Sequence, residues 1–305
     1  MDNRNEVREF LATRRARLAP NQVGLPVLGG TRRVAGLRRE EVALLAGVSV
    51  EYYTRLERGS LRGVSESVLE ALVRALQLDD TERAHLFDLA RAANSTASMV
   101  RTRRSPSPGQ IRPSVHRVLD AITAPAWIRN ARSDVLALNP LGRALYAPVL
   151  DSPVRPANTA RFLFLDPSSS DFYIDWEQTA TELVGVLRAE AGRNPHDRSL
   201  SNLVGELSTR SEEFRVRWAH HDVRQHRAGA KRLHHPIVGD LDLTYEALEL
   251  AADPGLGLVV YTAEPGSPTQ DALTLLATWV ATVEARASTT PESDIPDGTG
   301  GTDKA

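Results

Sequence analysis

The sequence predicts a multidomain protein, with an all-α N-terminal domain of five helices followed by an α+β domain with a mostly antiparallel sheet. Apolar residues recur at helical spacing through residues 1–94, where no run alternates as a strand would. Residues 95–111 are polar with Pro and Gly, which is typical of a linker. Between 112 and 286, strand-like runs lie at both ends of a helical centre. The polar residues 287–305 are expected to form a disordered tail.

The first three helices of the N-terminal domain are marked by their ends. The first is expected at residues 7–18, and a loop rich in Gly and Pro follows it. The segment "LRREEVALLAG" is predicted to be a helix that Gly47 ends. The segment "SVEYYTRLERG" is predicted to be a helix that Ser49 caps and Gly59 ends.

The fourth and fifth helices carry capping signals. In "SVLEALVRALQL", Ser67 and Glu70 have the spacing of a capping box. Asp79 and Glu82 stand in the same relation at the start of "DDTERAHLFDLARAAN". These signals complete the prediction of five helices before the linker.

In the second domain, the spacing of apolar residues changes from a helical period to alternation in several segments. A helix at 114–122 precedes "AWIRN" and "DVLALN", which alternate like paired strands. A helix at 140–147 and the apolar run "ARFLFLD" follow. Three helices are predicted next, at 175–191, 198–208 and 211–221, and Ser211 opens the last of them. Three strand-like runs follow, which are "AKRLHHPIV", "LDLTYEALEL" and "GLVVYTA". A final helix is predicted at 268–286.

Charge is distributed unevenly between the two halves. Residues 1–110 contain 18 Arg against 13 acidic residues, whereas residues 111–305 contain 19 Arg and Lys against 26 acidic residues. This asymmetry indicates that the front half meets a polyanion. The absence of cysteine excludes disulfides and thiolate metal sites. With no long apolar run and no signal-peptide pattern, we expect a cytoplasmic protein without a membrane span.

Residues 37–60 have the pattern of two short helices joined by a tight turn. Gly47 suits a turn that needs positive φ, and Ala43 permits close approach of the helices. Tyr53 and Leu56 fall on the predicted core side, and Tyr52 falls on the outward side. Such a pair can dock its second helix in a DNA major groove. The same spacing also fits a plain helical hairpin with solvated arginines.

The string "LRREEVALLAGVSVEYYTRLERG" resembles the helix-turn-helix of the lambda-repressor-like family (XRE), and it is close to the MmyB-like branch of that family. The preceding "GLPVLGGTRRVAGLRREEVA" also resembles that branch. The resemblance covers residues 8–93 and implies a five-helix bundle with Ser49–Glu57 as the recognition helix. It implies base contacts from Val50, Glu51 and Arg55. It implies phosphate contacts from Arg38, Arg39, Ser49, Tyr52, Ser60 and Arg62.

The chemistry of these side chains suits the implied contacts. Arg55 can pair bidentately with a guanine, and Val50 can touch a thymine methyl. Glu51 has two interpretations, which the sequence leaves open. It can accept a hydrogen bond from cytosine N4, or it can pair with Arg55 four residues later and orient it.

The second half resembles the MmyB-like ligand-binding domain, which has a PAS-like fold and is associated with a bound fatty acid. The matching strings lie between about 112 and 280, and they are "RNARSDVLALNPLGRALY", "RFLFLDPSSSDFYIDWE", "FRVRWAHHDV", "KRLHHPIVGDLDLTYEALEL" and "LVVYTAEPGSP". A sheet covered by helices leaves room for an apolar pocket. We therefore expect an apolar small-molecule ligand, such as a fatty acid, and no other cofactor.

Candidate pocket residues are large apolar side chains, which could equally be ordinary core residues. They are Trp127, Leu138, Phe162, Phe164, Trp176, Leu183, Leu187, Trp218, Leu243, Tyr245 and Val260. A carboxylate headgroup would need a polar or cationic partner. The candidates for that role are Arg217, His221, His235 and Tyr245.

The histidines support a rival hypothesis of a metal or catalytic site. They are His220, His221, His226, His234 and His235, together with Asp222. However, the sequence contains no H-E-x-x-H, no G-x-S-x-G and no phosphate-binding glycine loop. We therefore expect no enzyme activity and no metal.

The leading hypothesis is a one-component transcriptional regulator that binds double-stranded DNA as a homodimer and senses an apolar small molecule. In an alternative hypothesis, the C-terminal domain serves dimerisation or protein interaction without a ligand. A metal-dependent enzyme fused to a DNA-binding domain is the third.

Overall fold

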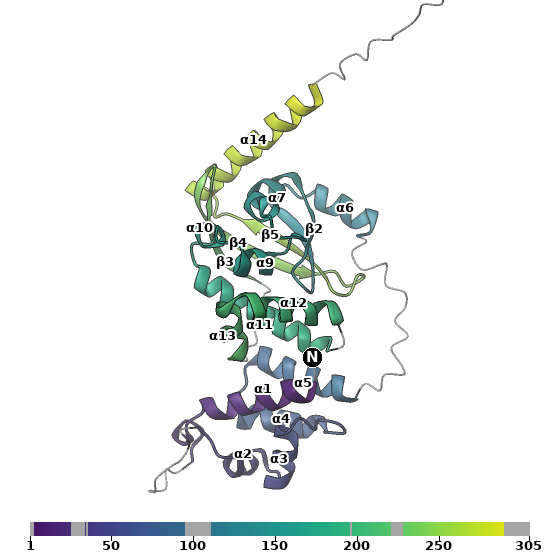
Figure 1. The fold of residues 1–305 in the computed structure, drawn as a ribbon, viewed down its shortest axis with the longest axis vertical. Coiled ribbons are helices and arrows are strands. Elements are labelled where there is room, and N and C mark those ends of the chain that lie inside the picture. The colour runs from purple at the N-terminus through teal and green to yellow at the C-terminus, as the bar shows by residue number, and fades with distance from the viewer. Residues whose placement is uncertain are drawn as a thin grey trace, which may run out of the picture.

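The computed structural model describes residues 3–25, 34, 36–94, 111–195, 197–220 and 228–289, with side chains described up to residue 283 in the last segment. Two domains lie one above the other along the long axis of the molecule (Figure 1). The helical N-terminal domain occupies one end, and helix α14 projects from the other. The prediction of an all-α domain followed by an α+β domain is confirmed. The predicted linker and most of the tail lie outside the described residues.

The N-terminal domain is a bundle whose helices share one apolar core. The buried residues include Phe10, Tyr53, Leu56 and Leu72, each with none of its surface exposed. The elements are α1 (Asn3–Arg17), a 3₁₀ turn (Pro20–Val23), α2 (Arg39–Ala46), α3 (Val50–Glu57), α4 (Glu66–Ala75) and α5 (Asp80–Asn94).

Two of the three predicted caps are present. The Ser49 hydroxyl accepts a hydrogen bond from the Tyr52 amide, and Asp79 and Glu82 accept from each other's amides. The capping box at Ser67 and Glu70 was wrong. Helix α4 begins at Glu66, and Ser65 caps it. Two serines stand two residues apart, and the earlier one takes the cap.

A buried carboxylate fastens three helices of the bundle together. Glu57 at the end of α3 is 2% exposed. Its oxygens accept hydrogen bonds from Arg15 of α1, at 2.9 and 3.1 Å, and from Arg39 of α2, at 3.2 and 3.3 Å. Burial alone would raise the pKa of Glu57, but the hydrogen bonds and charges of the two arginines outweigh burial and lower it.

The C-terminal domain is built on a five-stranded antiparallel sheet with the strand order β2-β1-β5-β4-β3. The strands are β1 (Ala126–Asn130), β2 (Val135–Leu138), β3 (Ala228–His235), β4 (Gly239–Glu249) and β5 (Leu256–Thr262). Strand β1 is an interior strand of the sheet and pairs with β2 on one side and β5 on the other. Its register with β2 shifts between Ile128 and Arg129, where Leu136 of β2 has no partner in β1, whereas its pairing with β5 is continuous.

The two faces of the sheet are covered differently. Ala126, Ile128 and Leu258 face α6 (Pro113–Asp120), whereas Trp127 and Val259 face the larger core. Most helices of the domain contribute to that larger core, and α11 to α13 lie between the sheet and the N-terminal domain (Figure 1). The helices that contribute to the larger core include α7 (Pro140–Leu145), α8 (Ala147–Asp151), α9 (Thr159–Leu165), α10 (Ser169–Phe172), α11 (Trp176–Arg193), α12 (Arg198–Arg210) and α13 (Glu212–Ala219).

The apolar run "ARFLFLD" forms helix α9. Its cap is Asn158, whose side-chain oxygen accepts hydrogen bonds from the amides of Ala160 and Arg161 at 2.9 Å. Phe162 and Leu163 are buried in the larger core. A helix that is buried on most sides loses its polar stripe, which is why the run lacks a readable period.

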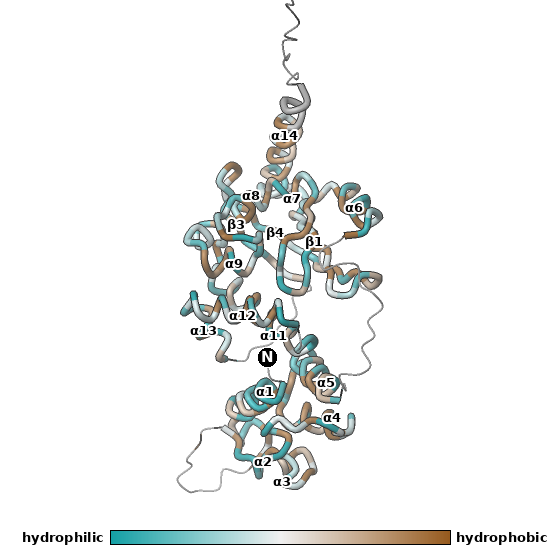
Figure 2. Tube along the Cα trace, turned by 45° about the vertical axis from the view of Figure 1, so that its right-hand side comes forward, coloured by the Kyte–Doolittle hydropathy of each residue, from teal (hydrophilic) through white to brown (hydrophobic). Residues whose placement is uncertain are grey.

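The last helix, α14 (Pro268–Thr289), starts inside the domain and leaves it. Leu273 and Leu276 in its first turns are buried in the larger core. Further along, Leu275, Trp279 and Val283 are 60%, 44% and 45% exposed, at spacings of four residues. Figure 2 shows apolar residues recurring along this projecting helix. Residues four apart share a face of a helix, so α14 carries an exposed apolar stripe.

The two domains meet where α1 and α5 pack on α11. Arg188 of α11 is fully buried, and its Nη1 lies 2.6 Å from Oε1 of Glu6 in α1. The guanidinium also stacks on the Trp218 ring, 4.1 Å from the centroid, and donates to the Trp218 carbonyl. His85 of α5 lies 3.7 Å from the same Glu6 oxygen. The contact between the domains therefore combines a buried ion pair with apolar packing, because Ala189 of α11 belongs to the core of the N-terminal domain.

We predict that Glu57→Gln lowers the free energy of unfolding at pH 7 by about 1–3 kcal/mol, because a buried charged acceptor of two arginines is lost. The folded-state pKa of Glu57 is lowered, so its contribution is present above the unfolded pKa and is lost as the pH falls through the folded value. The difference between variant and wild type should therefore shrink below about pH 4. Urea denaturation followed by circular dichroism at pH 7 and at acid pH measures this. The exposed Glu66→Gln is the control, and a difference that does not change with pH would contradict the assignment.

Candidate functional site

The turn between α2 and α3 sets the angle of the second helix. Gly47 has φ 65° and ψ 34°, in the left-handed region that glycine adopts without strain. The Val48 amide donates to the Ala43 carbonyl at 3.0 Å, which closes the turn. Ala43 is 1% exposed and offers only a methyl group to the neighbouring helices. Helix α3 thereby presents one side to the core and the other to solvent.

The outward side of α3 forms an exposed surface, which we call the recognition face, made of Val50, Glu51, Tyr52 and Arg55. Val50 is 42% exposed, and Glu51 and Arg55 are exposed as well. The Arg55 guanidinium lies over the half-buried Tyr52 ring, 4.8 Å from its centroid. Within the described residues, no ion pair joins Glu51 to Arg55. The aromatic ring, rather than the carboxylate, supports the arginine.

Four further polar residues were predicted to contact phosphate. Arg38, Ser60 and Arg62 are exposed, and Arg38 lies 3.3 Å from Glu40. Arg39 bonds to Glu57 while half of its side chain remains exposed. Arg39 therefore fastens α2 to α3, a role that the sequence did not indicate.

The C-terminal domain contains a small cavity between the sheet and α11, which we call the inner cavity. It encloses about 50 Å³. Its walls combine aromatic and apolar side chains with several polar ones. They are Trp127, Arg129, Ser133, Tyr146, Thr159, Tyr173, Thr179, Leu183, Val186, Lys231, Val259 and Tyr261.

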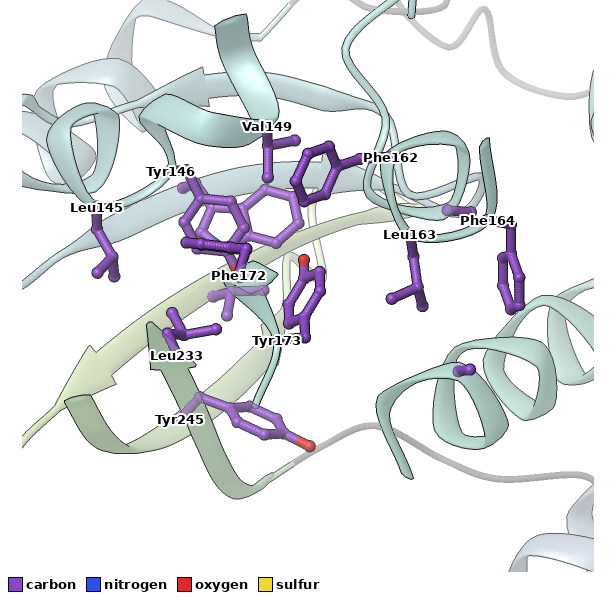
Figure 3. Packing of buried hydrophobic residues seen from close by; sticks show 14 of the residues in the cluster. Leu145, Tyr146, Val149, Phe162, Leu163, Phe164, Phe172, Tyr173, Leu233 and Tyr245 are labelled. Carbon is purple, nitrogen blue, oxygen red and sulfur yellow. The ribbon is translucent and has the colours of Figure 1, made fainter. Parts of the chain in front are cut away.

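Tyrosine hydroxyls and a lysine make part of this wall polar. The hydroxyls of Tyr146 and Tyr261 are hydrogen-bonded to each other. Figure 3 shows Tyr146 beside Phe172 and Tyr173. Burial raises the pKa of Tyr146, Tyr173 and Tyr261, so each hydroxyl keeps its proton at neutral pH. Lys231 is 6% exposed and lies 3.3 Å from Glu182 and 3.2 Å from the Thr179 hydroxyl.

A second, larger cavity lies between the domains, and we call it the interdomain groove. It is open to solvent and has a volume of about 860 Å³. Ala84 and Asp88 of α5 form one side, and α11 and the ends of β1, β4 and β5 form the others. Arg129 and Val186 line both this groove and the inner cavity. The two cavities thus adjoin at these side chains.

Two family models match the chain. Residues 111–276 match the MmyB-like transcription regulator ligand binding domain. The chain belongs to the MmyB-like transcription regulators. Residues 6–86 match a helix-turn-helix domain, which places the recognition face within a DNA-binding module. A search of the curated proteins gives no match. The two matches support a DNA-binding transcription regulator with a ligand-binding domain.

In this MmyB-like regulator, only part of the predicted pocket set lines the inner cavity. Trp127 and Leu183 do so. Others pack in the larger core around it, namely Leu138, Phe162, Phe164, Trp176, Leu187, Trp218, Leu243 and Tyr245. Val260 packs instead against the other core, on the α6 side of the sheet.

The three predicted headgroup partners that the structure describes line neither cavity. Arg217 bonds to Glu213 and Glu177 and faces the Trp176 ring. His235 is 1% exposed, with Nε2 3.0 Å from the Ala144 carbonyl and Nδ1 3.3 Å from the Ile237 amide. Both nitrogens of His235 therefore bind backbone, and burial lowers its pKa. Tyr245 belongs to the neighbouring core, and His221 lies outside the described residues.

Arg129, a cationic residue that lines both cavities, was missed by the sequence interpretation. It stands two residues after Trp127 in the strand "AWIRN". Side chains two apart in a strand share a face, so a buried Trp127 places Arg129 on the inward side. A charged residue at an inward position was the signal that could have identified it.

Two observations concern the metal-site hypothesis and the expectation of no membrane span. In the described part of the regulator, no three His, Cys, Asp or Glu side chains gather where they could hold a metal ion. His234 pairs with Asp240, whereas Asp222 and His226 fall outside the described residues. Among the helices described, none combines the length and apolar character that crossing a membrane requires.

We predict that the adjacent tyrosines have separable roles. Tyr53→Ala should lower the free energy of unfolding by about 3–5 kcal/mol, because its ring is fully buried in the N-terminal core. Tyr52→Phe keeps the ring beneath Arg55 and removes only the hydroxyl, so stability should hold while DNA affinity falls about two- to tenfold. Thermal denaturation and fluorescence anisotropy with labelled DNA measure the two effects. A stable Tyr53→Ala variant, or a Tyr52→Phe variant with full DNA affinity, would contradict this division.

Proposed function

We propose that this chain is a one-component, sequence-specific transcriptional regulator that acts in the cytoplasm as a homodimer. Its N-terminal domain reads double-stranded DNA through the recognition face. Its C-terminal domain senses an apolar small molecule, such as a fatty acid. The observation that carries the proposal is helix α11, which touches the inner cavity and the DNA-binding domain at once.

The DNA-reading half of the proposal rests on the geometry of α3. Arg55 projects from the exposed side and is held over the Tyr52 ring, so less side-chain freedom is lost when it binds a guanine. Val50 and Glu51 lie beside it in the first turn. Arg38, Ser60 and Arg62 are exposed and available for phosphate contacts, and the exposed part of Arg39 can add another.

The sensing half rests on the two contacts of α11. Thr179, Leu183 and Val186 line the inner cavity. Ala189, further along the helix, belongs to the core of the N-terminal domain, and Arg188 bonds to Glu6. A ligand that shifts α11 would therefore change the seating of the DNA-reading domain without any intermediate element.

One observation favours the alternative in which the C-terminal domain serves dimerisation without a ligand. The exposed stripe of Leu275, Trp279 and Val283 on α14 suits packing against a second copy of the same helix. Readers of this kind commonly bind two half-sites as symmetric dimers. The stripe and the cavities are separate features, so dimerisation and sensing are compatible.

Arg55→Ala tests the DNA-reading function. We expect the variant to lose sequence preference by about 1–3 kcal/mol at one base pair while keeping salt-sensitive binding through phosphate contacts. Selection of bound fragments from random DNA, followed by sequencing, measures the preference. Arg58→Ala, an exposed arginine at the end of the same helix, is the matched control. An unchanged motif with Arg55→Ala would refute the role of Arg55.

Organic extraction of the purified full-length protein, followed by mass spectrometry, tests the sensing function. We expect an apolar small molecule in about one copy per chain, or stoichiometric uptake of added acyl compounds. Protein that yields no such molecule and takes up none would refute sensing. If that protein is also a dimer that Trp279→Glu converts to monomer in light scattering, the dimerisation alternative is correct.

A further inference from the structure

One side of helix α14 is apolar and is not covered by the rest of the domain. Leu275, Trp279 and Val283 are exposed there, each four residues after the one before. Residues 272–283 contain no charged side chain, although most of them are exposed. A surface helix usually carries charged residues on its solvent side, and a helix without them is usually covered on that side as well.

Three exposed threonines lie beside these apolar residues, and their hydroxyls bond to the backbone of the same helix. Thr274, Thr278 and Thr282 each donate to the carbonyl four residues earlier, at 2.9, 2.9 and 2.8 Å. Covering these side chains with another protein surface therefore leaves no hydroxyl without a hydrogen bond. We call the surface made of these threonines and the three apolar residues above the α14 face.

We propose that the α14 face is the interface of the homodimer, and that two copies of α14 pack against each other in antiparallel directions. The proposal rests on the homodimer proposed above, and it adds the contact surface, the direction of the helices and the residues that meet. Helix α14 lies at the end of the molecule opposite the N-terminal domain, so the contact between the two helices does not cover the recognition face (Figure 1).

The sizes of the side chains on the α14 face fit an antiparallel pair. When the two-fold axis passes between Thr278 and Trp279, each bulky side chain lies opposite a threonine of the other copy. The opposing positions are Leu275 with Thr282, Trp279 with Thr278, and Val283 with Thr274. Large residues opposite small ones let two helices interdigitate closely. In a parallel pair each residue would face its own copy, so the Trp279 rings would crowd and the threonines would leave gaps.

The charges at the two ends of the α14 face favour the same direction. Asp271 is exposed and precedes Leu275 by four positions, and Arg286 follows Val283 by three. The same two-fold axis brings position 271 of one copy opposite position 286 of the other, whereas a parallel pair would place like charges opposite each other. A surface whose two halves complement each other is what a two-fold interface requires, which favours a second copy over an unrelated partner.

Sedimentation equilibrium of the full-length protein tests the contact surface. We expect wild type to dimerise, and Trp279→Glu to raise the Kd of the dimer at least about thirtyfold, because a charge replaces a central apolar contact. Leu275→Glu should act in the same direction. Ala277→Glu is the matched control, because this exposed position is two residues from both and lies off the α14 face, and its Kd should stay within about twofold of wild type. Melting curves by circular dichroism verify that the variants are folded.

The outcomes separate this interface from the homodimer itself. A dimer whose Kd changes with neither Trp279→Glu nor Leu275→Glu overturns the interface and leaves the homodimer in place. Wild type that stays monomeric at every concentration overturns the homodimer and the interface together, and the occupant of the α14 face is then a different protein.

Oxidative cross-linking tests the direction of the helices. Because the sequence contains no cysteine, each introduced thiol reports on one position. The Leu275→Cys protein and a size-tagged Thr282→Cys protein are mixed, left to exchange subunits and then oxidised. Antiparallel helices predict a disulfide between the two different variants, whereas thiols of the same variant lie about 10 Å apart along the helix, beyond the reach of a disulfide. Products that join only copies of the same variant would overturn the antiparallel direction.

An exchange of the end charges tests the residue pairs. We expect Asp271→Arg to weaken the dimer about three- to tenfold, because two positive charges then lie opposite each other at both ends of the contact. Adding Arg286→Asp to that variant should return the Kd to within about twofold of wild type, since the opposite charges are restored with their places exchanged. A double variant that dimerises no more tightly than Asp271→Arg would overturn the pairing of positions 271 and 286.

Discussion

The ion pair between Glu6 and Arg188 is the interaction on which the arrangement of this molecule depends. It joins the first helix of the DNA-binding domain to the 18-residue helix α11 of the C-terminal domain, across 182 positions of the chain. Replacing either partner alone would leave a buried charge without its counter-ion, which typically costs about 3–5 kcal/mol. The Trp218 ring and carbonyl hold the guanidinium from its other side. The pair therefore fixes α13, α11 and α1 relative to one another.

Helix α11 owes its double role to the sizes of its side chains. Gly192 lies so close to the His85 ring that a Cβ atom would collide with it, so the two helices can approach only because no side chain is present. One turn before, Arg188 inserts its charge between the domains. Larger side chains appear earlier in the helix, where Leu183 and Val186 line the inner cavity. Helix α11 thus has no side chain where it packs most closely against α5, and it has larger side chains where it lines the inner cavity.

Much of the fold could be predicted because its signals are local. Ser49, Asp79 and Glu82 bond to amides within three residues, and Gly47 needs only its own φ, so the sequence pattern is sufficient for each. The error at Ser67 arose because its neighbour Ser65 competes for the same cap. The inward faces of the strands could also be predicted, since alternation fixes them.

The polar side of the candidate site was harder to predict, because a partner distant in sequence decides whether a polar residue is available. His235 was a reasonable headgroup candidate until the Ala144 carbonyl, 91 positions away, occupied its ring nitrogen. Arg39 bonds to Glu57, 18 positions away. Neither contact can be recognised from the spacing of the residues that neighbour it in the sequence. The alternation that places Trp127 inward would have been enough to identify Arg129, which lines both cavities.

The ionic character of the domain boundary has a consequence for how easily it can open. An interface of apolar side chains exposes that surface to water when it parts, at about 25 cal/mol per Å². Glu6, Arg188 and His85 would instead regain hydration, which repays part of the lost attraction. The separated domains would present the solvated charges of Glu6 and Arg188 beside the small apolar side chain of Ala189. A boundary of this kind can be firm when closed and still part with less exposure of apolar surface than a wholly apolar interface.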